Sequence, residues 1–260
     1  MMDSLIPDMS RYFLEVAYKG THYAGFQTQD NAVTIQGEID KALSLLLREP
    51  VKTTGSSRTD TGVHAYQNYL HFDSNQPLLP HLRYKLNAVL SPDIVIRAIY
   101  AVGEDAHARF GALSRSYLYR VYNAKDPFLR ETGYYFPYPL EADVLHRTAA
   151  AILEYTDFTS FSKRNTQVKT FNCQIQHASW EKLPGQYVFH ITANRFLRGM
   201  VRGLVGTMLK TARGRLDTAD FRRIIEARIN LETDFSAPPQ GLFLMEVKYP
   251  EGLLNRPLPG

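Results

Sequence analysis

Apolar and polar residues alternate in several short runs along the chain and repeat at helical spacing in others. Residues 11–18 follow the two-residue period of a strand. After Thr34, which can cap a helix, Ile35 and Leu43 fall on one helical face in a run that continues to about Arg48. The same reasoning predicts strands over 51–54, 69–73, 94–102, 116–123, 174–181, 186–193 and 242–249, helices over 80–90, 140–154, 198–213 and 218–227, and loop over 123–140.

This order mixes strands and helices in each half without strict β-α-β alternation. Such an order predicts an α+β fold, with helices on one face of an antiparallel sheet. A change in composition at residues 103–107 marks the expected domain joint. We therefore expect an N-terminal half over residues 1–105 and a C-terminal half over residues 106–260.

Length and composition exclude several classes of protein. The chain has 260 residues, and its single Cys rules out an internal disulfide framework, which fits a reducing cytosol. Residues 1–13 lack the basic-then-apolar order of a signal peptide. No apolar run approaches the ~20 residues that a membrane helix needs. The sequence thus predicts a cytoplasmic protein without a membrane anchor.

The net charge of +4 is mild, but the basic residues are unevenly distributed. Only three acidic residues stand in the segment from Asn194 to Arg228, which carries nine basic side chains: Arg195, Arg198, Arg202, Lys210, Arg213, Arg215, Arg222, Arg223 and Arg228. A positive patch of this kind attracts phosphate and makes binding salt-dependent. The alternative interpretation is a solvated basic surface.

The predicted helix over 198–213 would separate basic from apolar residues. Arg195, Arg198 and Arg202 would share one helical face at offsets of three and seven. The apolar residues of the same run, which would face the core, are Val201, Leu204, Val205 and Met208. A row of guanidinium groups on the outer face could bind phosphate or pair with a carboxylate.

Residues 55–65, GSSRTDTGVHA, form the most unusual stretch of the chain. Small residues surround one cation, Arg58, and one carboxylate, Asp60, between two predicted strands. A catalytic loop needs a backbone that approaches a ligand closely and a few polar groups held by rigid elements. Asp60 could act as a nucleophile or a general base. The alternative is a turn in which Asp60 bonds local amides.

Other chemistries fit the sequence less well. Asp60-Thr61-Gly62 matches the short signature of aspartic proteases, but the chain has no second such motif to supply the partner carboxylate. No Gly-Lys pair exists for a P-loop. Asp60, His64 and His71 could be imagined as metal ligands, but the histidines are scattered and no metal site is expected. Cys173 is interpreted as a packed residue and not as a nucleophile.

The strand over 116–123 is rich in tyrosine. Tyr117 and Tyr119 point to one face and Tyr122 to the other. A tyrosine on an inner sheet face usually belongs to the core, but one beside basic residues can also stack on an unpaired base.

Taken together, these segments closely resemble the tRNA pseudouridine synthase A family. The resemblance spans nearly the whole chain and is carried, in order, by YKGTHYAGFQTQ, GSSRTDTGVHA, HARFGALSRSYLYRVYN, DFTSF, NRFLRGMVRGLVGTML and GLFLMEV. It implies an isomerase that converts uridine to pseudouridine at positions 38, 39 and 40 of the tRNA anticodon stem-loop. It implies no metal or other cofactor, tRNA as the partner, and a homodimer. For the fold it implies two similar α/β-sandwich halves of the ferredoxin or RRM kind, joined through a mainly antiparallel sheet, with the active-site cleft between them.

The resemblance also assigns roles to individual residues. Asp60 matches the essential carboxylate, and Arg58 the arginine that helps to displace the target base. Tyr117 matches the tyrosine that packs against the flipped uracil, and Leu244 a hydrophobic residue of the base pocket. Arg202 matches the arginine that pairs with the catalytic aspartate, where its charge would favour the ionised carboxylate.

Two further basic residues, Arg198 and Lys210, are predicted to contact the RNA. Small differences from the family pattern, such as Ser56-Ser57, affect substrate choice and not the reacting groups. A non-catalytic RNA-binding or folding-helper protein on the same scaffold remains an alternative, because it would keep the basic patch and leave Asp60 without a chemical role. An aspartyl hydrolase is a third hypothesis, which lacks its second carboxylate.

Overall fold

The computed structural model describes residues 10–163, 168–255 and 257–259. Residues 1–9, on which most of the signal-peptide prediction rests, lie outside these ranges. The chain divides into an N-terminal unit, Met1–Leu113 with Glu246–Gly260, and a C-terminal unit, Ser114–Met245. This division differs from the predicted joint at residues 105/106, and it returns the end of the chain to the first unit. The assignment of the two halves as domains stays a prediction.

A mostly antiparallel sheet forms the centre of the N-terminal unit. Its strands are β1 (Ser10–Tyr18), β2 (Thr54–Gly55), β3 (His64–Ser74), β4 (Ile94–Val102) and the last residues of β9 (Leu242–Lys248). The order is β4-β1-β3-β9, and β2 pairs with β3. The central strand β1 pairs antiparallel with both β3 and β4, and Phe13, Leu14 and Val16 are fully buried in it. Both faces of β1 therefore contribute to the core.

Helices α1 (Ile35–Leu47) and α2 (Leu82–Val89) complete this unit. The side chain of Thr34 accepts a hydrogen bond from the Gly37 amide at 3.2 Å, so it caps α1 as predicted. The helix ends at Arg48, whose backbone adopts the left-handed conformation that often closes a helix. Ile35 and Leu43 are buried, which confirms the apolar stripe read from the sequence.

The C-terminal unit is built on a second group of strands. These are β5 (Ser114–Tyr122), β6 (Tyr134–Tyr135), β7 (Ile175–Leu183), β8 (Gln186–Ala193) and the first residues of β9. The order is β9-β5-β8-β7. Strands β5, β8 and β7 pair antiparallel, while β6 pairs parallel to the end of β5. The short β6 lies inside residues 123–140, so the prediction of loop throughout that segment is wrong at this point.

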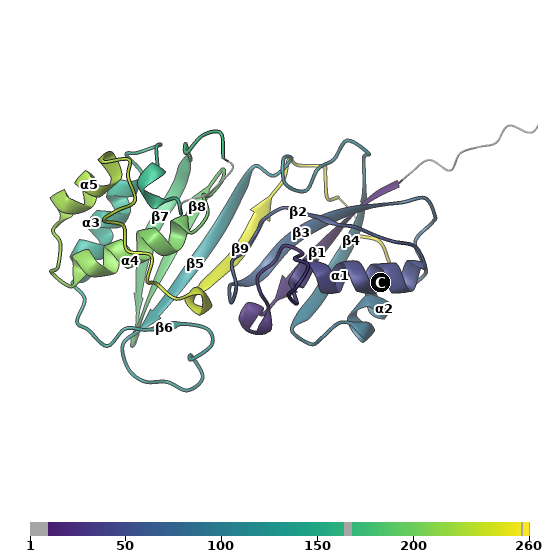
Figure 1. The fold of residues 1–260 in the computed structure, drawn as a ribbon, viewed down its shortest axis with the longest axis horizontal. Helices are drawn as coiled ribbons and strands as arrows, with labels where there is room; N and C mark the ends of the chain where they lie inside the picture. The colour runs from purple at the N-terminus through teal and green to yellow at the C-terminus, as the bar shows by residue number, and fades with distance from the viewer. Residues whose placement is uncertain (1–9, 164–167, 256, 260) are drawn as a thin grey trace, which may run out of the picture. The chain divides into compact units, whose positions relative to one another are not determined.

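Helices α3 (Ala142–Ile152), α4 (Met200–Ala212) and α5 (Thr218–Glu226) lie beside β7 and β8 within this unit (Figure 1). The Trp180 indole on β7 donates to the Met208 sulfur on α4 at 3.4 Å, which ties the helical layer to the strands. Helix α4 is buried on nearly every side, with Leu204 and Val205 fully enclosed. It is therefore the core helix of the unit.

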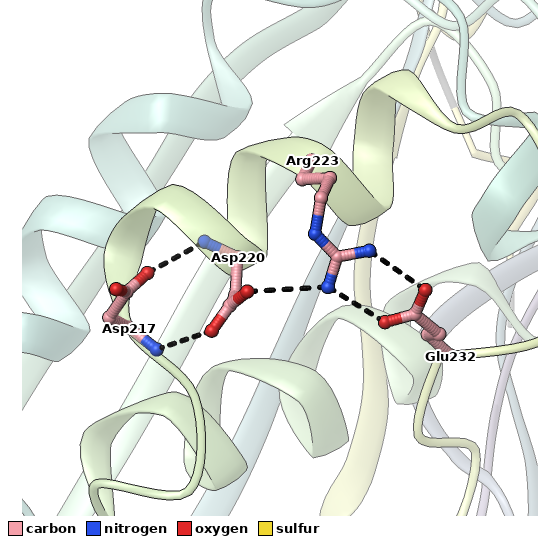
Figure 2. Close-up of polar contacts among 4 residues, drawn as sticks. All are labelled: Asp217, Asp220, Arg223 and Glu232. Carbon is pink, nitrogen blue, oxygen red and sulfur yellow. Dashed lines mark hydrogen bonds and ion pairs between the residues drawn. The ribbon is translucent and has the colours of Figure 1, made fainter.

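Helix α5 begins with a capping box (Figure 2). The Asp217 side chain accepts from the Asp220 amide, and the Asp220 side chain accepts from the Asp217 amide. The Arg223 guanidinium bonds Asp220 at 3.2 Å and Glu232 at 2.8 and 2.9 Å. Local side-chain contacts thus define this helix and hold the segment that follows it.

The α+β prediction is confirmed by this arrangement. Strand β3 begins at His64, five residues earlier than predicted, because the end of the 55–65 segment already pairs with β1. The similarity of the two halves and the cleft between them stay predictions. Within the described ranges, no helix is long and apolar enough to cross a membrane.

Candidate active site

The backbone of residues 55–65, here called the Asp loop, is held by hydrogen bonds to neighbouring segments. The Phe26 amide donates to the Thr59 carbonyl at 3.0 Å, and the Ser56 amide donates to the Tyr69 carbonyl at 2.7 Å. The first contact comes from the segment before α1 and the second from β3. The Asp loop is therefore positioned by two separate parts of the N-terminal unit.

Buried polar side chains add a second set of restraints. The Tyr18 hydroxyl hydrogen-bonds the Thr59 hydroxyl at 2.9 Å, and Asn68 donates its side-chain amide to the Ser57 carbonyl at 2.9 Å. Burial raises the pKa of Tyr18 to about 12, so this hydroxyl remains protonated at neutral pH. Because buried polar groups are expensive to leave unpaired, these contacts specify the loop conformation.

Sequence reasoning missed Tyr18 and Asn68 as supports of the site. The strand prediction for residues 11–18 gives Tyr18 no role beyond that of a strand residue. Asn68 stands between Gln67 and Tyr69 on β3 and is fully buried. Because the predicted strand over 69–73 begins after Asn68, no local pattern marks this residue as a buried polar group that needs a hydrogen-bond partner.

Two glycines outside the Asp loop allow close backbone packing against it. A side chain at Gly20 would place its Cβ 2.0 Å from the Val63 carbonyl oxygen. Gly25 has a φ of +94°, and a Cβ there would lie 3.0 Å from the Thr59 carbonyl oxygen. These close contacts explain why glycines stand at positions 20 and 25 in the segment YKGTHYAGF.

Asp60 begins a tight turn and is half-buried. The Val63 amide donates to the Asp60 carbonyl at 3.1 Å, and Gly62 has a φ of 77° at the third position of the turn. This bond uses the backbone of Asp60, which any residue type could supply. Closure of the turn therefore does not explain why a carboxylate stands at this position.

Arg58 is exposed and lines a cavity of about 260 Å³ within the N-terminal unit. His107, Arg109 and Phe110 line the same cavity. The Phe110 ring is 79% exposed and packs 4.4 Å from the His107 ring, centroid to centroid. The described lining does not include Asp60. The cavity thus joins Arg58 to exposed rings of the kind on which an unpaired base stacks.

The other residues assigned by the resemblance lie in the C-terminal unit. Tyr117 on β5 is buried and contacts Phe196 edge to face, with ring centroids 5.0 Å apart. Leu244 on β9 is fully buried, and Arg202 on α4 donates Nε to the Ala237 carbonyl at 2.6 Å. The pairing of Arg202 with Asp60 would join the two units, and it stays a prediction.

The predicted basic face of the helix over 198–213 is wrong in one respect. Helix α4 begins at Met200, after Gly199 with its φ of 75°, so Arg195 and Arg198 precede the helix and cannot share a helical face with Arg202. The predicted apolar side is confirmed, because its four members are buried: Val201, Leu204, Val205 and Met208. A glycine with positive φ, which ends helical geometry, explains the difference.

The nine basic residues from Arg195 to Arg228 also present less positive charge to a ligand than their number suggests, because three of them form ion pairs. Arg222 pairs with Glu154 at 2.5 Å, and Arg228 pairs with Asp157 at 3.2 Å. Arg223 bonds two carboxylates of its own unit (Figure 2). Internal pairing lowers the field that these arginines present to a phosphate. Glu154 and Asp157 come from distant parts of the sequence, so the window from Asn194 to Arg228 could not reveal their pairing.

Two of the three possible metal ligands, His64 and His71, accept hydrogen bonds from backbone amides. His64 Nδ1 accepts from the Gly20 amide at 3.0 Å, and His71 Nδ1 accepts from the Ala108 amide at 3.1 Å. Among the described residues, no group of three His, Cys, Asp or Glu side chains could hold a metal ion. Cys173 is buried as predicted, and burial raises the pKa of its thiol to about 11.

Comparison with known proteins identifies the family. The family described as tRNA pseudouridine synthase matches residues 15–111 and 155–250. The tRNA pseudouridine synthase A of Parabacteroides distasonis is 46% identical over 247 residues, covering 94% of this chain and 98% of that protein. The protein of the same name from Bacteroides thetaiotaomicron is 45% identical, covering 95% and 93% of the two chains.

A more distant relative, tRNA pseudouridine synthase A of Staphylococcus aureus, is 32% identical over 94% of this chain and 92% of its own. A crystal structure of a putative chlorite dismutase aligns with a TM-score of only 0.21 and 11% identity, over 83% of this chain and 99% of that one, and carries no argument. The family match includes the Asp loop in one unit, α4 in the other, and β9, whereas β5 lies between its two matched ranges. The chain therefore belongs to the tRNA pseudouridine synthase family, a family of isomerases.

Proposed function

We propose that this protein isomerises uridine to pseudouridine at positions 38, 39 and 40 in the anticodon stem-loop of tRNA, with Asp60 as the essential carboxylate and without a cofactor. The observation that carries the proposal is the construction of the Asp loop. A buried network and close glycine contacts hold its backbone, while Asp60 and Arg58 keep side chains that the turn itself does not require. Membership of the family supplies the reaction.

The chemistry of the reaction explains the need for a carboxylate. The bond between ribose C1′ and uracil N1 breaks, and a bond from C1′ to uracil C5 forms. C5 loses a proton and N1 gains one, so the product is an isomer and no oxidant or hydrolytic water is consumed. The carboxylate of Asp60 acts either by attacking C1′ or by removing a proton from the adjacent ribose carbon. Both roles require the ionised form.

The reacting uridine must leave the RNA helix before the reaction. Unstacking costs a few kcal/mol, which contacts with the protein must offset. Arg58 is well suited to enter the space left by the base, because it is exposed and lines the same cavity as Phe110. Tyr117 would pack against the extruded uracil, and Leu244 would line an apolar pocket that keeps water from the sugar intermediate.

The remaining assignments concern binding and assembly. Arg202 would pair with Asp60 and favour the charged carboxylate, and its Nε contact with the Ala237 carbonyl restrains the guanidinium. Arg198 and Lys210 are exposed and would contact phosphates. The protein is proposed to work as a homodimer in the cytoplasm.

The test is a map of pseudouridine in tRNA transcripts after incubation with the pure protein. Wild-type protein is expected to modify uridines at positions 38, 39 and 40, whereas Asp60→Asn, which removes the charge but keeps the shape, abolishes the modification and still binds tRNA. Asp30→Asn is the matched control, because Asp30 is an exposed aspartate of the same unit.

Three results would overturn parts of the proposal. Normal turnover by Asp60→Asn would remove the assigned role of Asp60. Tight tRNA binding by the wild-type protein without any pseudouridine would favour a non-catalytic RNA-binding protein. Cleavage of a peptide substrate would revive the hydrolase hypothesis.

A further inference from the structure

The C-terminal unit contains a second cavity, here called the C-terminal pocket, of about 480 Å³. It lies between the end of α4, the segment around β6 and the segment that follows α5. Its volume falls in the range of about 300–1,000 Å³ that is usual for small-ligand sites. Its described lining includes neither Tyr117, Arg202 nor Leu244, so it is distinct from the site assigned to the reacting uracil.

One wall of the C-terminal pocket is aromatic. Tyr134, Phe136 and Tyr138 follow one another along the chain, with ring centroids 5.4 and 5.2 Å apart and edge-to-face geometry. The Phe136 amide donates to the Tyr122 carbonyl at 2.8 Å, which fixes this wall to the end of β5. Phe136 is buried and Tyr138 is 43% exposed. The wall is thus preformed and presents one accessible ring.

The lining of the pocket is also basic. Lys210, Arg213 and Arg215 line it, and the Arg213 guanidinium carbon lies 3.4 Å from the centre of the Tyr138 ring. A guanidinium stacked on a ring keeps its N–H edge available for a phosphate or a base. These three cations differ from Arg223 on α5, whose guanidinium bonds carboxylates on two sides (Figure 2).

A single carboxylate, Asp234, completes the lining. Its backbone is pressed against α4, because a Cβ at Gly206 would lie 2.2 Å from the Asp234 carbonyl oxygen. The Asp234 amide donates to the Thr207 hydroxyl at 3.1 Å, and the Ser236 amide donates to Asp234 Oδ1 at 2.8 Å. These contacts fix the orientation of the carboxylate and leave it lone pairs for further donors.

Rings, cations and a fixed carboxylate together indicate the chemical class of the ligand. A simple anion would use the cations but not the rings, and an apolar ligand would use the rings but not the cations. A nucleotide uses all three, because its base stacks on a ring or guanidinium, its phosphate contacts the cations, and a carboxylate accepts from N–H groups on the edge of the base. Guanine carries two such groups side by side and matches a carboxylate best.

We propose that the C-terminal pocket binds an unpaired nucleotide of the tRNA substrate other than the reacting uridine, with preference for guanine. This inference rests on the proposed function, because it takes tRNA as the substrate. It assigns Lys210 to a defined pocket together with Arg213 and Arg215, and it gives Tyr138 and Asp234 a role in substrate binding.

The experiment compares pocket variants with the wild-type protein by tRNA binding and by pseudouridine formation. Arg213→Ala and Tyr138→Ala are each expected to weaken binding of a tRNA transcript about tenfold. KM for tRNA should rise by much more than kcat falls. Tyr138→Phe keeps the ring and should lose less affinity than Tyr138→Ala. Arg147→Ala is the control for loss of an arginine in the same unit, because Arg147 is exposed on α3 and does not line the pocket.

Asp234→Asn tests the base preference. Asparagine can still accept from the Ser236 amide, but it offers an N–H group where the carboxylate accepts. NMR titration of the wild-type protein with GMP and with AMP is expected to shift the Arg213 side-chain signal, with GMP binding more tightly. In Asp234→Asn this preference should disappear, while melting temperatures confirm that each variant is folded.

The outcomes separate this inference from the proposed function. If Arg213→Ala and Tyr138→Ala bind tRNA within about twofold of wild type, the pocket does not hold a nucleotide, even though pseudouridine formation would stand. Equal binding of GMP and AMP by wild type would remove the guanine preference. Absence of pseudouridine with the wild-type protein would overturn the proposed function, while the binding measurements would still decide the role of the pocket.

Discussion

The Asp loop and the segment from Asn194 to Arg228 were the two regions that sequence reasoning considered functional, and the structure treats them differently. In the Asp loop, neighbouring segments bond the backbone, while Arg58 stays exposed and Asp60 half-exposed. In the basic segment, some side chains form ion pairs and others line a pocket. Arg222, Arg223 and Arg228 form ion pairs with acids of their own unit, whereas Lys210 and Arg213 line a pocket.

This difference shows what makes a residue available for function. A functional side chain needs a backbone that is held in place, and an arginine already paired with a carboxylate adds less to the field that a phosphate meets. Charge density along the sequence does not measure this, because ion-pair partners come from distant positions such as Glu154 and Asp157. The sequence pattern of the Asp loop predicted a held backbone more reliably. A short polar loop between strands can pair its buried N–H and C=O groups only with neighbouring segments.

The largest effect is expected from breaking the support of the Asp loop. Asn68→Leu keeps the approximate shape of the side chain but leaves the Ser57 carbonyl and the Tyr18 hydroxyl without the donor that Asn68 supplies. We expect a loss of about 2–3 kcal/mol in the free energy of unfolding, because the unpaired groups remain buried. Urea denaturation followed by far-UV circular dichroism measures the change.

The control for this prediction is Gln29→Leu, which removes an exposed amide that donates to the Ala24 carbonyl. Its effect on stability should be small. Tyr18→Phe should fall between the two, because it deletes one hydroxyl and leaves Asn68 bonded to Ser57. Equal stability of Asn68→Leu and wild type would show that the network does not hold the loop.

A smaller effect is expected from acid, acting through His71 on β3. Burial, followed by the charges of His107 and Arg11, lowers the pKa of His71 to about 4, while Asp73 opposes the shift. The unfolded value is about 6.5, so the unfolded chain binds a proton that the folded protein resists as pH falls between these values. The stabilisation is complete above about pH 6.5 and is lost toward pH 4, at about 1–2 kcal/mol after allowance for solvent screening.

Urea midpoints between pH 7.5 and pH 4.5 check this expectation. In His71→Asn the side-chain oxygen can still accept from the Ala108 amide, but the residue does not titrate in this range. Part of the pH dependence should therefore disappear in His71→Asn and persist in His146→Asn, which replaces an exposed histidine on α3. Identical pH profiles for His71→Asn and wild type would contradict the assignment.

The smallest effect sharpens the contrast within the basic segment. Lys210→Ala and Arg198→Ala should each reduce the slope of log binding constant against log salt by about one, because each removes one phosphate contact. Arg223→Ala should leave the slope unchanged, since its charge is already paired with Glu232 and Asp220 (Figure 2). An equal change in all three variants would mean that the ion pairs on α5 open when RNA binds.

Several features could be predicted from local sequence because they depend on local physics. The two-residue period located β1, β4 and β8, and the cap at Thr34 with its apolar stripe located α1. Where a local rule was overridden, a backbone feature was responsible. Gly199 at positive φ delayed the start of α4, and pairing with β1 extended β3 to His64.

The sequence by itself determined the family, the strand and helix order, and the presence of a loop with Arg58 and Asp60, because these depend on the identity and spacing of nearby residues. Only the tertiary structure decided that Tyr18 and Asn68 support that loop, that Arg222 pairs with Glu154, and that Tyr138 and Arg213 meet at a pocket. Hydrogen bonds, ion pairs and ring stacking depend on distance in space, and residues far apart in the chain acquire that proximity only on folding.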